Sequence, residues 1–300
     1  MAGLAATMDP LQQYRLVKGG AAAVHLRRDV VRAEGPDAGA YLQGQLSQDV
    51  AALSQGESAW SLVLAPAGRV DALVRVTRLD DGWIVDTDGG WGEALVARLG
   101  RFKLRTKVDF ALLDWKAVGL RGPAVVAPAP DEGAPVVVDA SWPGLAGLDL
   151  LGPAPAVPAG MAEVDGATYE ALRIEAGVPV NGAELTERTI PAEAGIVGRT
   201  VSFTKGCYTG QELVARIDSR GSNVARHLRG VLLDGPVPAG ATLESAGKQV
   251  GWVTSAARSP ALGWVGLAYL ARSVVPPCEV GVSGGGVARV RALPLDGGEA

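Results

Sequence analysis

The C-terminal quarter of the chain alternates short strand-like runs with turns, and this pattern restricts the fold more than any other feature. Each run is rich in apolar residues, and Gly, Pro and Ser separate one run from the next. Short strands at this spacing are typical of small all-β domains, so we expect a small β-barrel. The runs are residues 228–233, 249–257, 264–269, 279–282 and 287–292.

The preceding part of the chain mixes helices with hairpins. Asp37 and Asp165 each stand before an apolar periodic run and are expected to cap helices. Residues 122–160 are proline-rich and are expected to form short strands and loops. The expected helices cover residues 37–46, 91–99 and 167–176, and the expected strands cover 30–34, 60–64, 70–79, 83–86 and 103–113.

Composition excludes several classes of protein. The chain has 300 residues and a net charge of −4, which argues against general nucleic-acid binding. No apolar run approaches the ~20 residues of a membrane helix, and the N-terminus lacks a basic signal-peptide region. Two cysteines do not make a disulfide framework. We therefore expect a cytoplasmic protein with reduced thiols and no membrane partner.

Residues 205–212 (KGCYTGQE) carry the strongest chemical signal. Thr209 and Glu212 have the spacing of a capping box, which predicts a helix that starts at about Thr209. Cys207 then lies just before the helix, near Lys205, and both surroundings favour the thiolate. The alternative is that Cys207 is a small buried apolar residue. Cys278 lacks such surroundings and is expected to be inert.

Other catalytic patterns are weak. A Cys-His-Asp hydrolase would need His25 or His227, and neither lies in a motif. The cysteines and histidines are too scattered for a zinc site, and no phosphate-binding loop occurs.

Two further features suit a ligand that carries both a ring and a carboxylate. A basic stripe begins at Arg98, and its last three members, Lys103, Arg105 and Lys107, alternate as on one face of a strand. The stripe would bind an anion, or it is a solvated face. Glu175 stands late in a helix before Gly177, where it could bind an amino-pyrimidine ring in bidentate fashion. A surface glutamate is the alternative.

Residues 205–212 resemble the signature of the YgfZ family of folate-binding proteins, whose mitochondrial members are iron–sulfur assembly factors. Three more stretches resemble that family in the same order: residues 41–47 (YLQGQLS), 101–108 (RFKLRTKV) and 172–179 (LRIEAGVP). The resemblance covers residues 24–270 and extends, outside the octapeptide, to the superfamily that contains the glycine-cleavage T-protein.

The resemblance implies an α+β fold of two interleaved ferredoxin-like modules plus a C-terminal β-barrel, around a tetrahydrofolate cavity. It implies a folate-binding region over 1–225, with the second module at roughly 55–120, and a barrel over 226–300. Glu175 would bind the pterin, and Lys103, Arg105 and Lys107 the glutamyl tail.

The resemblance also implies a role in assembling or repairing iron–sulfur clusters. Cys207, with Lys205 and Tyr208, would be the functional site, and Cys207 would ligate a transient cluster shared with a partner. One cysteine cannot hold a cluster alone, because such clusters take about four protein ligands. The expected partners are folate and iron–sulfur assembly or client proteins, and the chain itself is expected to be a monomer.

One departure separates this chain from the transferases of the superfamily. They carry a catalytic aspartate in a segment like GGxxDDL, and the matching position here is Ala72, with Asp71 one residue earlier. One residue of offset on a strand turns a side chain to the other face, so Asp71 is not expected to substitute without a register shift. The alternative function, a folate-dependent aminomethyltransferase, is therefore disfavoured.

Overall fold

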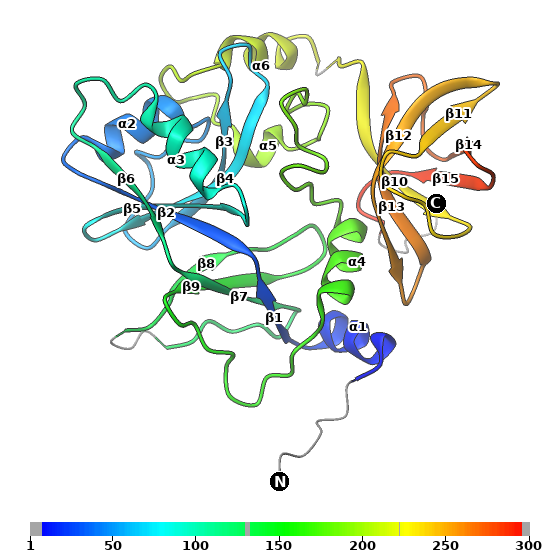
Figure 1. Ribbon diagram of the computed structural model, residues 1–300, viewed down its shortest axis with the longest axis horizontal. Coiled ribbons are helices and arrows are strands. Elements are labelled where there is room, and N and C mark those ends of the chain that lie inside the picture. The colour runs from blue at the N-terminus through cyan, green and yellow to red at the C-terminus, as the bar shows by residue number, and fades with distance from the viewer. Residues whose placement is uncertain (1–7, 130–132, 222, 296–300) are drawn as a thin grey trace.

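The computed structural model describes residues 8–129, 133–221 and 223–295, which form two open sheets, a barrel and six helices (Figure 1). The five-stranded sheet has the order β3-β4-β5-β2-β6. Its strands are β2 (Arg28–Glu34), β3 (Ser58–Leu64), β4 (Val70–Leu79), β5 (Gly82–Asp88) and β6 (Asp109–Leu113).

The four-stranded sheet has the order β1-β7-β9-β8 and exchanges chain segments with the first sheet. Only Arg27 separates β1 in this sheet from β2 in the five-stranded sheet. Likewise, two residues separate β6 in the five-stranded sheet from β7 in this one. The chain therefore crosses between the sheets twice, which interleaves them. The strands are β1 (Ala22–Leu26), β7 (Lys116–Arg121), β8 (Val136–Asp139) and β9 (Gly147–Gly152).

The barrel is closed by six antiparallel strands in the order β10-β13-β12-β11-β14-β15. Alternate residues of these strands point inward and form an apolar core that includes Val231, Val253 and Val290. The strands are β10 (Arg226–Leu233), β11 (Thr242–Ser245), β12 (Lys248–Ser259), β13 (Gly263–Ala271), β14 (Cys278–Val282) and β15 (Val287–Arg291). The expected α+β fold with a C-terminal barrel is confirmed.

The helices cover the sheets on their apolar faces. Helices α2 and α3 pack on the five-stranded sheet, where Leu42, Leu95 and Leu99 join its core. Helix α4 packs against α1 and against barrel strands β12 and β13. The helices are α1 (Pro10–Gly19), α2 (Ala38–Gln45), α3 (Gly92–Gly100), α4 (Gly166–Ala176), α5 (Val197–Thr200) and α6 (Gln211–Asp218). No helix within the described residues is long and apolar enough to cross a membrane.

Local signals account for α4. The Asp165 side chain accepts a hydrogen bond from the Thr168 backbone N–H at 2.7 Å, as the cap prediction requires. The helix ends at Gly177, whose φ of +71° is a left-handed conformation that glycine adopts without strain. Glu175 is therefore fixed in the last turn of a helix that is capped at both ends.

Three predictions of local structure are wrong. Asp37 does not cap α2 through its side chain, which instead accepts from the Lys107 backbone N–H at 2.8 Å. Residues 103–108 form a turn and irregular backbone, and the strand begins only at Asp109. Helix α6 begins after Gly210 without a side-chain cap, so the Thr209 capping box does not form.

A chain of buried ion pairs joins the two open sheets. Arg75 of β4 donates to Asp86 of β5 at 3.0 and 2.9 Å and to Asp149 of β9 at 2.9 Å. Arg121 of β7 lies 2.9 Å from Asp149, and Arg28 of β2 donates to Asp86 at 2.8 Å. Burial alone would raise the pKa of Asp149, but Arg121, Arg75 and Arg28 reverse that effect and lower it to about 2.

Replacing Asp149 by Asn should therefore destabilise the protein. Arg75 and Arg121 would remain buried with one carboxylate fewer, and breaking such a pair costs about 3–5 kcal/mol of unfolding free energy. The pKa of Asp149 is lower in the folded than in the unfolded chain. Its contribution is thus present above about pH 4 and is lost as pH falls towards about 2. Urea unfolding of both proteins between pH 2 and 7 measures this.

The control is Asp114→Asn, because Asp114 is exposed and pairs only with Lys116 within the described residues. The control should match the native protein. Equal stability of Asp149→Asn and native protein at pH 7 would show that the ion chain does not hold the sheets together.

Candidate functional site

The loop that carries the octapeptide is fastened to the end of α2 by Lys205. The Lys205 ammonium donates to the backbone carbonyls of Gln43, Leu46 and Gln48 at 2.5, 2.7 and 2.9 Å. It also lies 5.1 Å from the ring centroid of Tyr208, which is buried beneath it. Burial lowers the pKa of Lys205 to about 8. Lys205 is therefore an anchor of the loop.

Three further features of the loop are also structural. The Thr209 backbone N–H donates to the Gly44 carbonyl at 3.2 Å, and the Tyr208 N–H donates to Gln211 Oε1 at 3.2 Å. Gly210 has a φ of +81°, and a Cβ there would lie 2.5 Å from the Ala65 carbonyl oxygen. Only glycine lets the loop approach the turn between β3 and β4 this closely. Two of the motifs singled out in the sequence, 41–47 and 205–212, are thus in direct contact.

Cys207 is exposed on this loop, so the alternative of a buried apolar cysteine is wrong. Gly206 beside it has open space around it. The two features expected to favour the Cys207 thiolate are not in place. The Lys205 ammonium donates to a carbonyl of α2, and the capping box does not form. What remains is an accessible sulfur on a fixed loop. Cys278 is half-buried and packs against the barrel core.

Glu175 is buried, with 4% of its surface exposed, so the alternative of a surface glutamate is wrong. The Tyr14 hydroxyl of α1 donates to Glu175 Oε2 at 2.8 Å, and Lys18 Nζ lies 4.0 Å from the same oxygen. Burial and the Glu175 carboxylate raise the pKa of Tyr14. Glu175 Oε1 has no hydrogen-bond partner.

An orphaned buried carboxylate oxygen costs free energy unless a donor meets it. A reduced folate carries neighbouring N–H donors on its amino-pyrimidine ring, so the residues present fit that group at Glu175. Tyr14 and Lys18 were missed by sequence reasoning. The signal for α1 was present, since Asp9 and Gln12 form a capping box around Pro10.

The basic stripe does not form the expected strand face. Lys103 Nζ pairs with Asp109 at 2.5 Å, and the Lys103–Lys107 segment lies in the connection from α3 to β6. In Figure 1 that connection lies at the outer side of the five-stranded sheet, whereas α4, which carries Glu175, lies beside the barrel. The assignment of Lys103, Arg105 and Lys107 to a glutamyl tail stays a prediction.

Asp71 and Ala72 line one cavity of about 480 Å³, together with Trp91, Arg98 and Phe102 among others. The β3–β4 ladder is irregular here: Val63 pairs with Ala72 and Leu64 pairs with Val70, which leaves Asp71 as an inserted residue. Such a bulge redirects a side chain and is the register shift that would let Asp71 face the side of Ala72. The Asp71 carboxylate accepts from Arg98 Nε at 2.7 Å.

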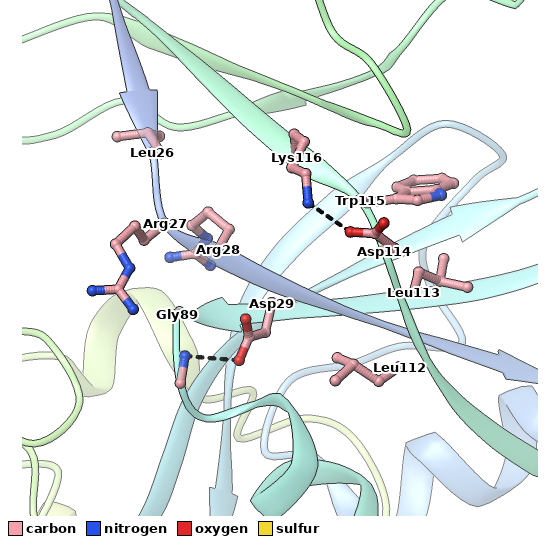
Figure 2. Close-up of a pocket in the computed structure, with 11 residues that line it drawn as sticks. Leu26, Arg27, Arg28, Asp29, Gly89, Leu112, Leu113, Asp114, Trp115 and Lys116 are labelled. Atoms are coloured by element: carbon pink, nitrogen blue, oxygen red, sulfur yellow. Dashed lines mark hydrogen bonds and ion pairs between the residues drawn. The ribbon is translucent and has the colours of Figure 1, made fainter.

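A second cavity, of about 500 Å³, lies where the two crossings between the sheets run side by side (Figure 2). Asp29 at its floor accepts from the backbone N–H groups of Gly90 and Gly92 at 2.8 and 2.7 Å, which ties β2 to the start of α3. Lys116 pairs with Asp114 at 2.6 Å on the opposite wall. None of the predicted site residues lines this cavity. Within the described residues, no three His, Cys, Asp or Glu side chains gather in a group that could hold a metal ion.

Comparison with known proteins identifies the family. The C-terminal barrel domain of the glycine cleavage T-protein matches residues 226–294. An aminomethyltransferase of Rubrobacter xylanophilus is 30% identical over 277 residues, which cover 81% of this chain and 72% of that protein. This chain belongs to the YgfZ and glycine-cleavage T-protein superfamily.

Two named branches of the superfamily are similar to this chain. The tRNA-modifying protein YgfZ of Klebsiella pneumoniae is 30% identical over 63% of this chain and 64% of that protein. The mitochondrial iron-sulfur cluster assembly factor IBA57 homolog of Pyricularia oryzae is 31% identical over 69% of this chain and 56% of that protein. The chain thus spans less than two thirds of the length of these two relatives.

A solved structure supports the fold. The aminomethyltransferase of the glycine cleavage system from Bartonella henselae superposes with a TM-score of 0.81, covering 96% of this chain and 90% of that one at 22% sequence identity. At that identity the likeness concerns the arrangement of sheets and barrel. It establishes that this YgfZ-like chain has the T-protein architecture.

Replacing Lys205 by Ala should loosen the octapeptide loop. Three partly buried carbonyls would lose their donor, which costs about 1–3 kcal/mol of unfolding free energy. Chemical denaturation measures the loss, and amide hydrogen exchange of residues 201–210 shows whether it is local. Lys248→Ala, at an exposed barrel position, is the control and should change neither. Unchanged exchange in Lys205→Ala would mean that Lys205 does not anchor the loop.

Proposed function

We propose that this protein is a tetrahydrofolate-binding accessory protein for the assembly or repair of iron–sulfur clusters, and that it acts through Cys207. The observation that carries the proposal is the division of roles in the octapeptide loop. Lys205, Tyr208 and Thr209 are engaged in holding the loop, whereas the Cys207 sulfur is exposed. A relative named as an iron-sulfur cluster assembly factor supports the same role.

Cys207 suits a shared bond better than a complete active site. Thiolates are soft ligands that suit iron–sulfur centres, and one cysteine supplies one of about four ligands. A partner would therefore supply the others. The neighbouring Gly206 limits steric hindrance around the sulfur, since it has open space on its side-chain face.

Folate would be held through Glu175. Its unpartnered Oε1 would accept from the ring, and Oε2, which already accepts from Tyr14, retains one lone pair for a second donor. Lys18, 4.0 Å from Oε2, would balance the buried charge. When bound, a reduced folate supplies nitrogen atoms that carry one-carbon units. We further propose residues 1–225 as the folate-binding region and 226–300 as the barrel domain.

A second candidate function is aminomethyl transfer, the alternative considered from the sequence. It is favoured by the bulge that places Asp71 in the same cavity as Ala72, and by the relative named aminomethyltransferase. It is disfavoured by the pairing of the Asp71 carboxylate with Arg98. Turnover in a glycine-cleavage assay that is lost in Asp71→Asn would promote this candidate over the first.

Replacing Glu175 by Gln should weaken folate binding while the fold is kept. Gln has the same shape, but its amide N–H₂ would face a ring donor where Oε1 now stands. A lost acceptor of this kind costs about 1–3 kcal/mol, or roughly 5- to 150-fold in Kd. Calorimetric titration with tetrahydrofolate measures it, with exposed Glu163→Gln as the matched control. Equal affinity would remove Glu175 from the site, and no heat with native protein would remove folate.

Replacing Cys207 by Ser should abolish the support of iron–sulfur enzymes. Serine keeps the size of the exposed side chain, so folding should be unchanged and only the soft sulfur is lost. In cells that lack the protein, native chain and Cys278→Ser should restore iron–sulfur enzyme activity, and Cys207→Ser should not. Full restoration by Cys207→Ser would contradict the proposed role of the thiol.

A further inference from the structure

The connection from α3 to β6 exposes apolar side chains that the core does not use. Leu104 is 94% exposed and Phe102 is 41% exposed. Leu104 also has a φ of +40°, one of two positive values at non-glycine residues of the described chain. The left-handed region disfavours a leucine and tolerates Asn or Gly. Neither the backbone nor the burial of Leu104 therefore stabilises the fold, and an outlier of this kind points to a function.

The exposed leucine is surrounded by positive charge. Arg101, Lys103, Arg105 and Lys107 flank it, in a chain whose net charge is −4. Among the ion pairs of the described residues, only Lys103 of these four takes part, with Asp109. The tip of the connection is thus an apolar residue in a basic rim, which complements an acidic surface with an apolar pocket.

The start of this connection lies close to the octapeptide loop, because Arg98 of the preceding helix α3 and the octapeptide loop both contact the C-terminal end of α2. On one side Arg98 Nη1 donates to Gln45 Oε1 at 3.4 Å, and the Arg98 guanidinium lies 5.0 Å from the Phe102 ring centroid. On the other side Thr209 donates to the Gly44 carbonyl. The octapeptide loop adds an apolar side chain of its own, Phe203, which is 51% exposed.

We propose that these two loops form one docking face for a protein partner that is acidic around an apolar pocket, with Leu104 as the inserted side chain. The docking face comprises residues 101–107 and 202–209. The inference rests on the proposed function, because it places the partner beside the Cys207 sulfur. The basic rim steers the acidic partner, and the leucine fixes its position.

Two other macromolecules fit the face less well. Sequence-tolerant RNA binding stacks successive bases on several aromatic rings. The guanidinium groups of Arg98 and Arg101 lie 5.0 and 5.7 Å from the Phe102 ring centroid, which leaves Phe203 as the more open ring of the face. A membrane surface favours an amphipathic helix, and residues 101–108 are turns and irregular backbone in which Leu104 alone is almost fully exposed.

The test uses full-length variants in cells that lack the protein, with iron–sulfur enzyme activity as the readout. Leu104→Asn suits the left-handed backbone, so its thermal midpoint should equal or exceed that of the native protein. Its support of enzyme activity should fall at least about fivefold, as should that of the double variant Arg105→Glu/Lys107→Glu. The matched controls lie on the barrel side: Val275→Asn, at a residue that is 68% exposed, and Lys248→Glu. Both should retain full activity.

Calorimetry and direct binding distinguish a protein partner from folate, RNA and a membrane. The docking face is a rival to the predicted assignment of Arg105 and Lys107 to a glutamyl tail, so it requires an unchanged folate affinity in the double variant. A loss of folate affinity would assign them to the glutamyl tail and overturn the docking face. The native protein is also tested for binding to tRNA and to phosphatidylserine vesicles. If it binds either and Leu104→Asn abolishes that binding, the docking face is overturned in favour of RNA or a membrane.

The failure of this inference can be told from the failure of the proposed function. Full activity of Leu104→Asn together with an inactive Cys207→Ser would overturn the docking face alone. Full activity of Cys207→Ser would overturn the proposed role of the thiol and, with it, the inference.

Discussion

The contact between Arg75 and Asp149 joins the two open sheets, and the two parts of the candidate site lie on different sheets. Helix α4, which carries Glu175, contacts β1 of the four-stranded sheet, whereas the octapeptide loop packs on the β3–β4 turn of the five-stranded sheet. Arg75 is wholly buried and donates to carboxylates on both sheets, Asp86 and Asp149. Buried charges tolerate little displacement, because lengthening any pair exposes a desolvated charge to an apolar interior. Strand β4 is thereby fixed against β9. The same strand begins at Val70, next to the turn against which Gly210 of the octapeptide loop packs.

The elements that could be predicted from the sequence are those whose signals are local. Apolar runs between turns predict the barrel strands, and Asp165 and Gly177 predict the two ends of α4. The prediction of a strand over Lys103–Lys107 is wrong because alternating residue types indicate a period of two but do not supply a neighbouring strand for backbone hydrogen bonds. Leu104, in the middle of that alternation, takes a left-handed conformation that no strand contains.

The candidate site was found only in part for a related reason. Glu175 and Cys207 were selected from their motifs, but their surroundings come from distant segments. Tyr14 reaches Glu175 from 161 residues away, and Lys205 reaches the Gln43 carbonyl from 162 residues away. The capping box at Thr209 does not form because the N-cap falls on Gly210, one residue later, and the Thr209 backbone N–H donates to the Gly44 carbonyl instead. Tertiary contacts of the loop thus overrode a local pattern.

The anchoring of the octapeptide loop explains how one exposed thiol could serve a transient partner. A loop that is ordered only on binding loses backbone entropy at that moment, and the loss weakens the complex. Here the three Lys205 hydrogen bonds and the buried Tyr208 ring order the loop beforehand. The partner then needs to immobilise little more than the Cys207 side chain. An ordered loop with an accessible sulfur can therefore form a bond that is directional and still easily released, as a shared ligand requires.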